Sequence, residues 1–198
     1  MSGTTRALRS DAERTVRTIL EAAERVFAAD PAASMEQVAE AAGVARTTVH
    51  RRFASREALL EALAAVAARE FGAAVEAAHP ETTPPLVALY QVTVNVLRVK
   101  RRWPFALELD RPGGSEPAWA HAEVELRCDR LLQRAKDDGV LRAGADLAWA
   151  KWVYYALIGV AARMRECEID AAATRVVDTL LCGVGTGQGL TRKGADVS

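Results

Sequence analysis

Apolar residues recur at helical spacing through most of the chain, and this pattern predicts an all-α fold. The first helix is expected at about Asp11–Ala29, and the Asp30-Pro31 pair ends it because a residue before proline avoids the helical region. A short second helix should follow Ser34, since Gln37 stands three residues later in the spacing of a capping box. Gly43 suits the left-handed position that ends such a helix in a tight turn.

The third expected helix, at about Ala45–Phe53, differs from its neighbours because most of its positions are polar. Only Val49 and Phe53, with Val44 just before the helix, offer side chains to a core. A helix of this kind is poorly suited to a protein interior but well suited to the DNA major groove, where base edges and phosphates accept its hydrogen bonds. A plain helical hairpin is the alternative that the spacing alone leaves open.

Longer helices are expected in the rest of the chain. A fourth helix is capped by Ser55 and continues to about Ala78, and the prolines at 80, 84 and 85 mark the next break. The later helices are expected at about Pro85–Arg101, Trp103–Asp110, Glu116–Asp138, Ala145–Cys167 and Asp170–Val184.

Charge is balanced overall but uneven along the chain. The 26 basic and 26 acidic residues give no net charge, which argues against a binder that holds DNA by charge alone. Between Val44 and Arg56, however, there are four arginines and no acid; the arginines are Arg46, Arg51, Arg52 and Arg56. Such a cluster suits contact with phosphates, although a solvated helix face has the same pattern.

No arrangement of residues indicates catalysis or metal binding. His50, His79 and His121 lack metal-ligand spacing, and the glycine-rich segment at 183–189 lacks the ending of a phosphate-binding loop. No Ser/His/Asp or Cys/His set has a supporting signature. We therefore expect no enzymatic activity, no cofactor and no metal.

The cysteines and the apolar runs indicate a cytoplasmic protein without a membrane partner. Cys128, Cys167 and Cys182 are odd in number and have no CxxC spacing, which is typical of reduced thiols. The first ten residues lack the apolar core of a signal peptide, and the longest apolar run, 152–162, is too short to span a bilayer.

Three blocks, at 18–27, 35–44 and 48–60, closely resemble the DNA-binding domain of the tetracycline-repressor (TetR) family in order and spacing. The resemblance covers about residues 14–62, and a weaker similarity lies at Gly139–Asp146. It implies an all-α protein with an N-terminal three-helix helix-turn-helix domain and a C-terminal helical domain that binds a ligand and forms a dimer.

The implied domains are a disordered arm at 1–10, the helix-turn-helix domain at 11–56, the helical domain at 57–185 and a disordered tail at 186–198. The implied function is a ligand-responsive transcriptional repressor that binds double-stranded operator DNA. Activation of transcription, and use of the helix-turn-helix only as a protein scaffold, are the alternatives that no residue excludes.

The resemblance also implies roles for individual residues. Residues at positions where family members face the major groove are Arg46, Thr47, Thr48, His50 and Arg51. Contacts with the DNA backbone are implied for Arg14, Arg17, Ser34, Arg52 and Arg56. Three positions depart from the family pattern, since Ala45 replaces a common capping serine, His50 a tyrosine and Arg52 an aromatic residue or histidine. These departures bear on the operator sequence rather than on DNA binding.

A homodimer is expected because one helix-turn-helix reads too few base pairs, whereas two copies read a pseudo-palindrome. The segment from Trp149 to Ala162 is apolar nearly all round and must be covered on both sides, and burial inside one subunit is the alternative to a four-helix dimer bundle. The expected interface residues are Trp152, Tyr155, Ala156, Gly159, Val160, Val177, Leu180, Leu181 and Val184.

A small-molecule effector, mostly apolar or aromatic, is expected from the aromatic residues between Tyr90 and Tyr154. Each of these side chains suits an ordinary core as well as a pocket. The expected ligand-binding residues are Tyr90, Asn95, Trp103, Phe105, Trp119, His121 and Tyr154, with Glu108 and Glu123 as further polar contacts.

Overall fold

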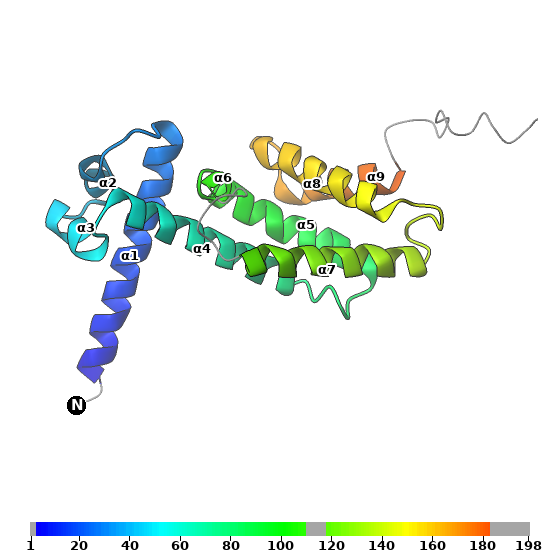
Figure 1. Ribbon diagram of the computed structural model, residues 1–198, viewed down its shortest axis with the longest axis horizontal. Helices are drawn as coiled ribbons and strands as arrows, with labels where there is room; N and C mark the ends of the chain where they lie inside the picture. The colour runs from blue at the N-terminus through cyan, green and yellow to red at the C-terminus, as the bar shows by residue number, and fades with distance from the viewer. Residues whose placement is uncertain (1–2, 110–117, 183–198) are drawn as a thin grey trace, which may run out of the picture. The chain divides into compact units, whose positions relative to one another are not determined.

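The computed structural model describes the backbone at residues 3–109 and 118–182, and the side chains at 11–107 and 123–182. Within these ranges the chain forms nine α-helices and no strand, which confirms the predicted all-α fold (Figure 1). The helices are α1 Gly3–Ala29, α2 Met35–Ala42, α3 Arg46–Arg52, α4 Arg56–Glu76, α5 Pro85–Arg102, α6 Ala106–Leu109, α7 Ala118–Asp137, α8 Leu147–Arg163 and α9 Ile169–Cys182.

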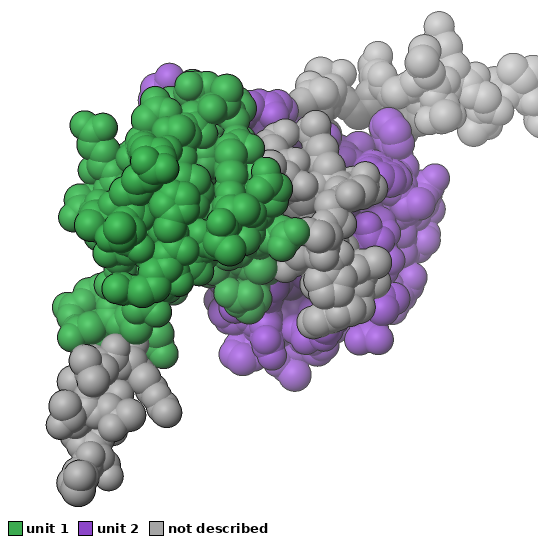
Figure 2. All heavy atoms as spheres, turned by 60° about the vertical axis from the view of Figure 1, so that its left-hand side comes forward, with its two compact units in different colours: residues 1–71, 102–120 green, residues 72–101, 121–198 purple. Residues whose placement is uncertain are grey.

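The chain divides into two compact units, which are coloured separately in Figure 2. The N-terminal unit comprises Met1–Phe71 and Arg102–Ala120, and the C-terminal unit comprises Gly72–Arg101 and His121–Ser198. The segment that follows α5 thus returns to the unit that contains α1. The predicted domain boundary after residue 56 stays a prediction, because compact units need not coincide with functional domains.

The N-terminal unit packs its helices around a core of apolar side chains. Phe27 of α1, Val38 of α2, Val49 of α3 and Leu63 of α4 are all fully buried, which is the outcome that the helical spacing of these residues predicts. Trp103, which follows α5, is also buried in this unit.

The ends of α2 confirm the sequence prediction closely. The Ser34 hydroxyl accepts a hydrogen bond from the Gln37 N–H at 3.3 Å, and the Gln37 side chain accepts one from the Ser34 N–H at 2.7 Å. Gly43 ends the helix in the left-handed conformation at φ 65°. A capped helix of eight residues therefore begins and ends at the positions that its sequence dictates.

Helix α1 begins earlier than expected. Residues 3–10, placed in a disordered arm by the sequence prediction, continue the helix back to Gly3. This part of the prediction needs correction, because good helix formers such as Ala7 and Leu8 extend an already nucleated helix at little cost. The predicted disordered tail at 186–198 lies outside the described residues.

Two further helices are shorter than expected, and side chains explain both differences. The buried Glu24 carboxylate accepts hydrogen bonds from the backbone N–H groups of Phe105 and Ala106, at 2.6 and 2.9 Å, so α6 begins at Ala106. The Arg101 guanidinium donates to the carbonyls of Met164 and Cys167, at 2.9 and 2.7 Å. These bonds satisfy carbonyls beyond Arg163, where α8 ends.

The C-terminal unit joins its helices through a buried polar contact as well as apolar packing. The Thr93 hydroxyl of α5 lies 2.8 Å from the Tyr154 hydroxyl of α8 and donates to the Leu89 carbonyl at 2.6 Å. Thr93 and Tyr154 are both buried, and their mutual hydrogen bond avoids the cost of an unpaired hydroxyl in the core. Burial also raises the pKa of the Tyr154 phenol, so this group stays protonated.

Candidate nucleic-acid interface

The turn between α2 and α3 sets the orientation of the candidate recognition helix. The Gly43 N–H bonds to the Glu40 carbonyl at 3.0 Å, and the Val44 N–H bonds to the Ala39 carbonyl at 3.1 Å. With its positive φ, Gly43 reverses the chain within two residues, a conformation that strains any residue with a Cβ. Val49 then anchors α3 to the core of the N-terminal unit.

Only Val49 of the seven residues of α3 is buried. The side chains exposed on this helix are Arg46, Thr47, His50, Arg51 and Arg52, and Thr48 is half-buried. Ala45 provides no side-chain cap, in agreement with the departure noted in the sequence. The predicted base-contacting residues therefore share one short helix whose surface the N-terminal unit leaves largely uncovered.

Arg46 and Glu36 form an ion pair that joins α3 to α2. The Arg46 Nη2 lies 2.7 Å from the Glu36 Oε1, and both side chains are exposed. The pKa of Glu36 is lowered, first by the hydrogen bond to its own backbone N–H in the first turn of α2 and also by Arg46. The carboxylate is thus ionised at neutral pH.

Arg17, one of the predicted backbone contacts, pairs with Glu70 of α4 at 3.1 Å. Glu70 also accepts a hydrogen bond from the Trp103 indole at 2.7 Å and lies 3.8 Å from Arg102. Burial raises the pKa of this carboxyl, but the bonds from Trp103 and Arg17 outweigh burial and lower it overall. Arg14 pairs with Asp11 one turn earlier on α1.

Arg56 makes several contacts within the N-terminal unit. Its guanidinium lies 4.8 Å from the centre of the Phe27 ring, and it donates to the carbonyls of Pro31 and, at 3.4 Å, Ala33. It therefore ties the start of α4 to the loop before α2. Its predicted contact with a phosphate stays a prediction, as does that of Ser34, whose hydroxyl accepts the capping bond from Gln37.

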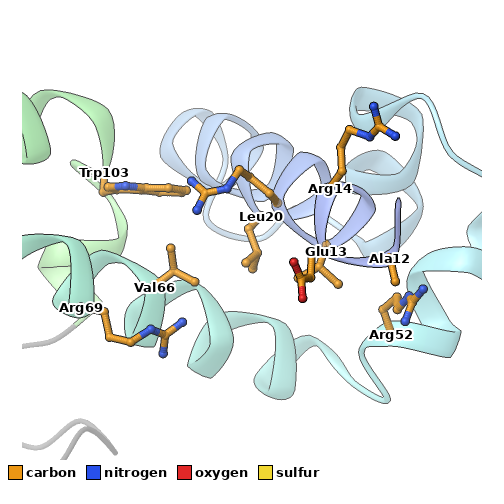
Figure 3. A pocket seen from close by; sticks show the side chains of 10 residues that line it. Ala12, Glu13, Arg14, Leu20, Arg52, Val66, Arg69 and Trp103 are labelled. Carbon is orange, nitrogen blue, oxygen red and sulfur yellow. The ribbon is translucent and has the colours of Figure 1, made fainter. Parts of the chain in front are cut away.

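A groove of about 650 Å³ lies between α1 and α4 in the same unit, with Arg52 of α3 at one end (Figure 3). Its lining combines apolar side chains with four arginines, three of which the sequence predicts to contact DNA. The lining residues are Ala12, Glu13, Arg14, Val16, Arg17, Leu20, Arg52, Val66, Arg69 and Trp103. The sequence had not singled out Arg69.

The predicted ligand-binding residues are divided between the two units. In the N-terminal unit, Trp103 bonds to Glu70, and the Phe105 ring lies 5.8 Å from the Phe27 ring. In the C-terminal unit, Tyr90 donates a hydrogen bond to Asp170 at 3.0 Å, and Asn95 donates one to the Ala74 carbonyl at 3.1 Å. Tyr154 is buried against Thr93, and Glu123 pairs with Arg127. The whole set of ligand-binding residues stays a prediction. The side chains of Glu108, Trp119 and His121 lie outside the described residues.

Helix α8 exposes an unusual amount of apolar surface. Trp149 is 68% exposed, Trp152 66% and Val160 50%, and their spacing places them on one side of the helix. Of the other predicted interface residues, Ala156 is exposed, and Tyr155, Gly159, Leu180 and Leu181 are half-buried. Val177 is buried within the unit, which leaves it little surface for a partner, and Val184 lies outside the described residues.

Among the residues that the structure describes, no helix is long and apolar enough to cross a membrane. No cluster of three His, Cys, Asp or Glu side chains in the same ranges could hold a metal ion.

Comparison with known proteins gives a family match for the N-terminal part of the chain. Residues 19–63 match the model of bacterial regulatory proteins of the tetR family. The HTH-type transcriptional repressor LfrR of Mycolicibacterium smegmatis is 45% identical over 85 residues, which are 43% of this chain and 45% of that protein. The match thus spans less than half the length of this curated relative.

Solved structures match over most of the chain. LfrR from Mycobacterium smegmatis in complex with proflavine has a TM-score of 0.65 and 29% identity, over 87% of this chain and 98% of that one. PfmR from Thermus thermophilus has a TM-score of 0.70 at 22% identity, over 84% and 98% of the two chains. FadR from Bacillus subtilis in complex with stearoyl-CoA has a TM-score of 0.62 at 18% identity, over 85% and 99%. These last two matches show the fold alone.

Proposed function

We propose that this chain is a transcriptional repressor of the tetR family, because residues 19–63 match the model of that family and the LfrR structure matches over most of the chain. In this proposal a homodimer binds a pseudo-palindromic operator in the cytoplasm and releases it when a small molecule binds. The observation that carries the proposal is α3, a short helix with one buried residue and a polar surface. Such a surface can form hydrogen bonds with base edges and phosphates in the major groove.

The exposed apolar face of α8 supports the homodimer. Two large side chains, Trp149 and Trp152, are each about two-thirds exposed, although aromatic groups of this size contribute strongly to association when buried. A second copy of the same face would cover them with matching apolar surface. Two subunits joined in this way present two copies of α3 to two half-sites.

Small-molecule regulation is supported by the ligand of a related structure. LfrR, whose structure is 29% identical to this chain, is known in complex with proflavine. Proflavine is a planar aromatic molecule, which falls within the class of effector proposed here. A ligand of this class lowers operator affinity only if it binds better to a conformation in which the two copies of α3 are wrongly spaced.

Selection of DNA by the full chain tests the proposal. The purified protein is used to enrich duplexes from a random-sequence library, and its affinity for them is measured by fluorescence anisotropy between about 50 and 200 mM salt. We expect enriched sequences with inverted half-sites about one helical turn apart (~34 Å), and affinity that falls steeply with salt. Lack of enrichment with no salt-sensitive complex contradicts the proposal.

A further inference from the structure

The ion pair between Glu36 and Arg46 is held from both sides by rigid elements. Glu36 is the second residue of α2, whose start is fixed by the Ser34–Gln37 capping box. Arg46 is the first residue of α3, which Val49 anchors in the core. The distance of 2.7 Å between Nη2 and Oε1 is that of a charge-assisted hydrogen bond. The Arg46 side chain is therefore oriented before any DNA arrives.

Stability alone does not account for this pair. The Arg46 side chain is 66% exposed and that of Glu36 46%, and ion pairs as exposed as this contribute little to folding. Arg46 also stands at the N-terminal end of α3, where the helix dipole disfavours a cation and where Ala45 supplies no cap. The Glu36 carboxylate offsets this unfavourable position of the positive charge.

The pair leaves Arg46 able to read a base. A guanidinium has five N–H donors, and the bond to Glu36 uses one hydrogen of Nη2. The other donors can bridge O6 and N7 of a guanine while the carboxylate still holds the group. An arginine that is already oriented also loses less side-chain freedom when it binds.

The same carboxylate acts against contact with a phosphate. To follow a phosphate, Arg46 must leave Glu36, and the ionised acid then faces the negative DNA backbone without a partner. Arg51 and Arg52 make no ion pair within the described residues, so no paired carboxylate competes with a phosphate for either guanidinium.

We propose that Glu36 is a specificity-determining residue, which orients Arg46 toward base edges and penalises its use on phosphates. The inference rests on the proposed function, since it concerns how the same helix reads DNA. It assigns to an acidic side chain of α2, which touches no base itself, a share of the preference for the operator over other duplexes.

A double-mutant cycle on the full chain tests this role. The variants are Glu36→Gln, Arg46→Ala and the two combined, with Glu40→Gln as the matched control. Glu40 lies on the same helix, is exposed and forms no ion pair in the described part of the chain. Affinities are measured for a duplex enriched by the wild-type protein and for poly(dI-dC) as generic DNA.

For Glu36→Gln we expect generic affinity to rise by about 2- to 5-fold, while affinity for the enriched duplex stays level or falls. Selectivity, the ratio of the two affinities, should drop by about 3- to 10-fold, within the range of one lost base contact. The drop should vanish in the Arg46→Ala background. Glu40→Gln should change both affinities by a similar factor and leave selectivity unchanged.

Two results overturn the inference while the proposed function stands. In the first, Glu36→Gln lowers selectivity by the same factor in the wild-type and the Arg46→Ala backgrounds. In the second, the wild-type protein is selective and Glu36→Gln leaves its selectivity unchanged. If the wild-type protein itself binds no duplex selectively, the proposed function fails and the inference fails with it.

Discussion

Helices α3 and α8 both present an uncovered face, but the chemistry of the two faces is opposite. The outer surface of α3 carries arginines, threonines and a histidine, whereas that of α8 carries tryptophans and aliphatic residues. Arginine and threonine side chains are satisfied by water until a hydrogen-bonding partner arrives. Tryptophans gain free energy only when another apolar surface removes them from water.

The comparison teaches that exposure alone does not identify a partner. A polar exposed helix suits a hydrated, charged partner such as DNA, because its contacts are specific hydrogen bonds. An apolar exposed helix suits a partner with the same chemistry, and a second copy of the chain is the simplest one. Substitutions that remove the apolar side chains of α8 or the polar side chains of α3 therefore test whether each face has the proposed partner.

The largest effect is expected from a charge placed on the apolar face of α8. Trp152→Glu should weaken dimerisation by at least about 30-fold, because it removes a large side chain that the proposed dimer would bury and places a carboxylate at the interface. Sedimentation equilibrium measures the change. Val87→Glu, at a site on α5 that is 44% exposed, is the control and should sediment like wild type. If Trp152→Glu remains as dimeric as the control, α8 does not form the interface.

A loss of base preference is expected from the polar face of α3. Arg51→Ala should cost about 1–3 kcal/mol of discrimination at one position of each half-site. Arg52→Ala should instead weaken all duplexes alike and reduce the salt slope by about 1. Affinities for the enriched duplex and its single-base variants, measured at several salt concentrations, separate the two. Equal losses on every duplex for both variants would contradict our assignment of Arg51 to a base.

Arg56 is expected to affect folding as well as DNA affinity. Arg56→Ala removes the bonds to the Pro31 and Ala33 carbonyls and the contact with the Phe27 ring, so the free energy of unfolding should fall by about 1–3 kcal/mol. In thermal unfolding, Tm should fall by about 2–4 °C for each kcal/mol lost. Arg69→Ala, an exposed site on α4, serves as the control. If Arg56→Ala instead unfolds at the same temperature as the wild type but binds DNA more weakly, the main role of Arg56 is contact with a phosphate.

The smallest effect concerns acid stability. The pKa of Glu70 in the folded protein lies below its ordinary value of 4.5, so the ionised carboxylate stabilises the fold at higher pH. This stabilisation is present above the unfolded pKa and is lost as pH falls through the folded pKa. Below about pH 5, wild type should therefore lose stability more steeply than Glu70→Gln in urea titrations. Glu61→Gln is the control on the same helix. If the stability of wild type and of Glu70→Gln falls equally with pH, the Glu70 carboxylate does not contribute to acid stability.

Local signals in the sequence predicted the helix-turn-helix well. Ser34, Gln37 and Gly43 act over three or four residues, and their backbone geometry follows directly from residue type. The polar character of α3 was likewise visible in its composition, and the match at residues 19–63 agrees with the resemblance drawn from three short blocks. Short-range chemistry was therefore sufficient for this part of the fold.

Contacts between distant residues could not be predicted in the same way. Glu36 and Arg46 meet only because of the angle between α2 and α3, and Glu24 reaches the start of α6 from α1. The aromatic residues between Tyr90 and Tyr154 were predicted as one set, yet Trp103 and Tyr154 belong to different compact units. Spacing along a chain carries no information on which of two cores a buried ring joins.

Of the seven residues of α3, only Val49 is buried, and this affects how the protein can evolve. Mutations at its outward positions leave the hydrophobic core intact, so a lineage can try many of them without losing the folded scaffold. New regulatory targets can thus be acquired one side chain at a time, while α1, α2 and α4 remain under the stricter demands of close packing.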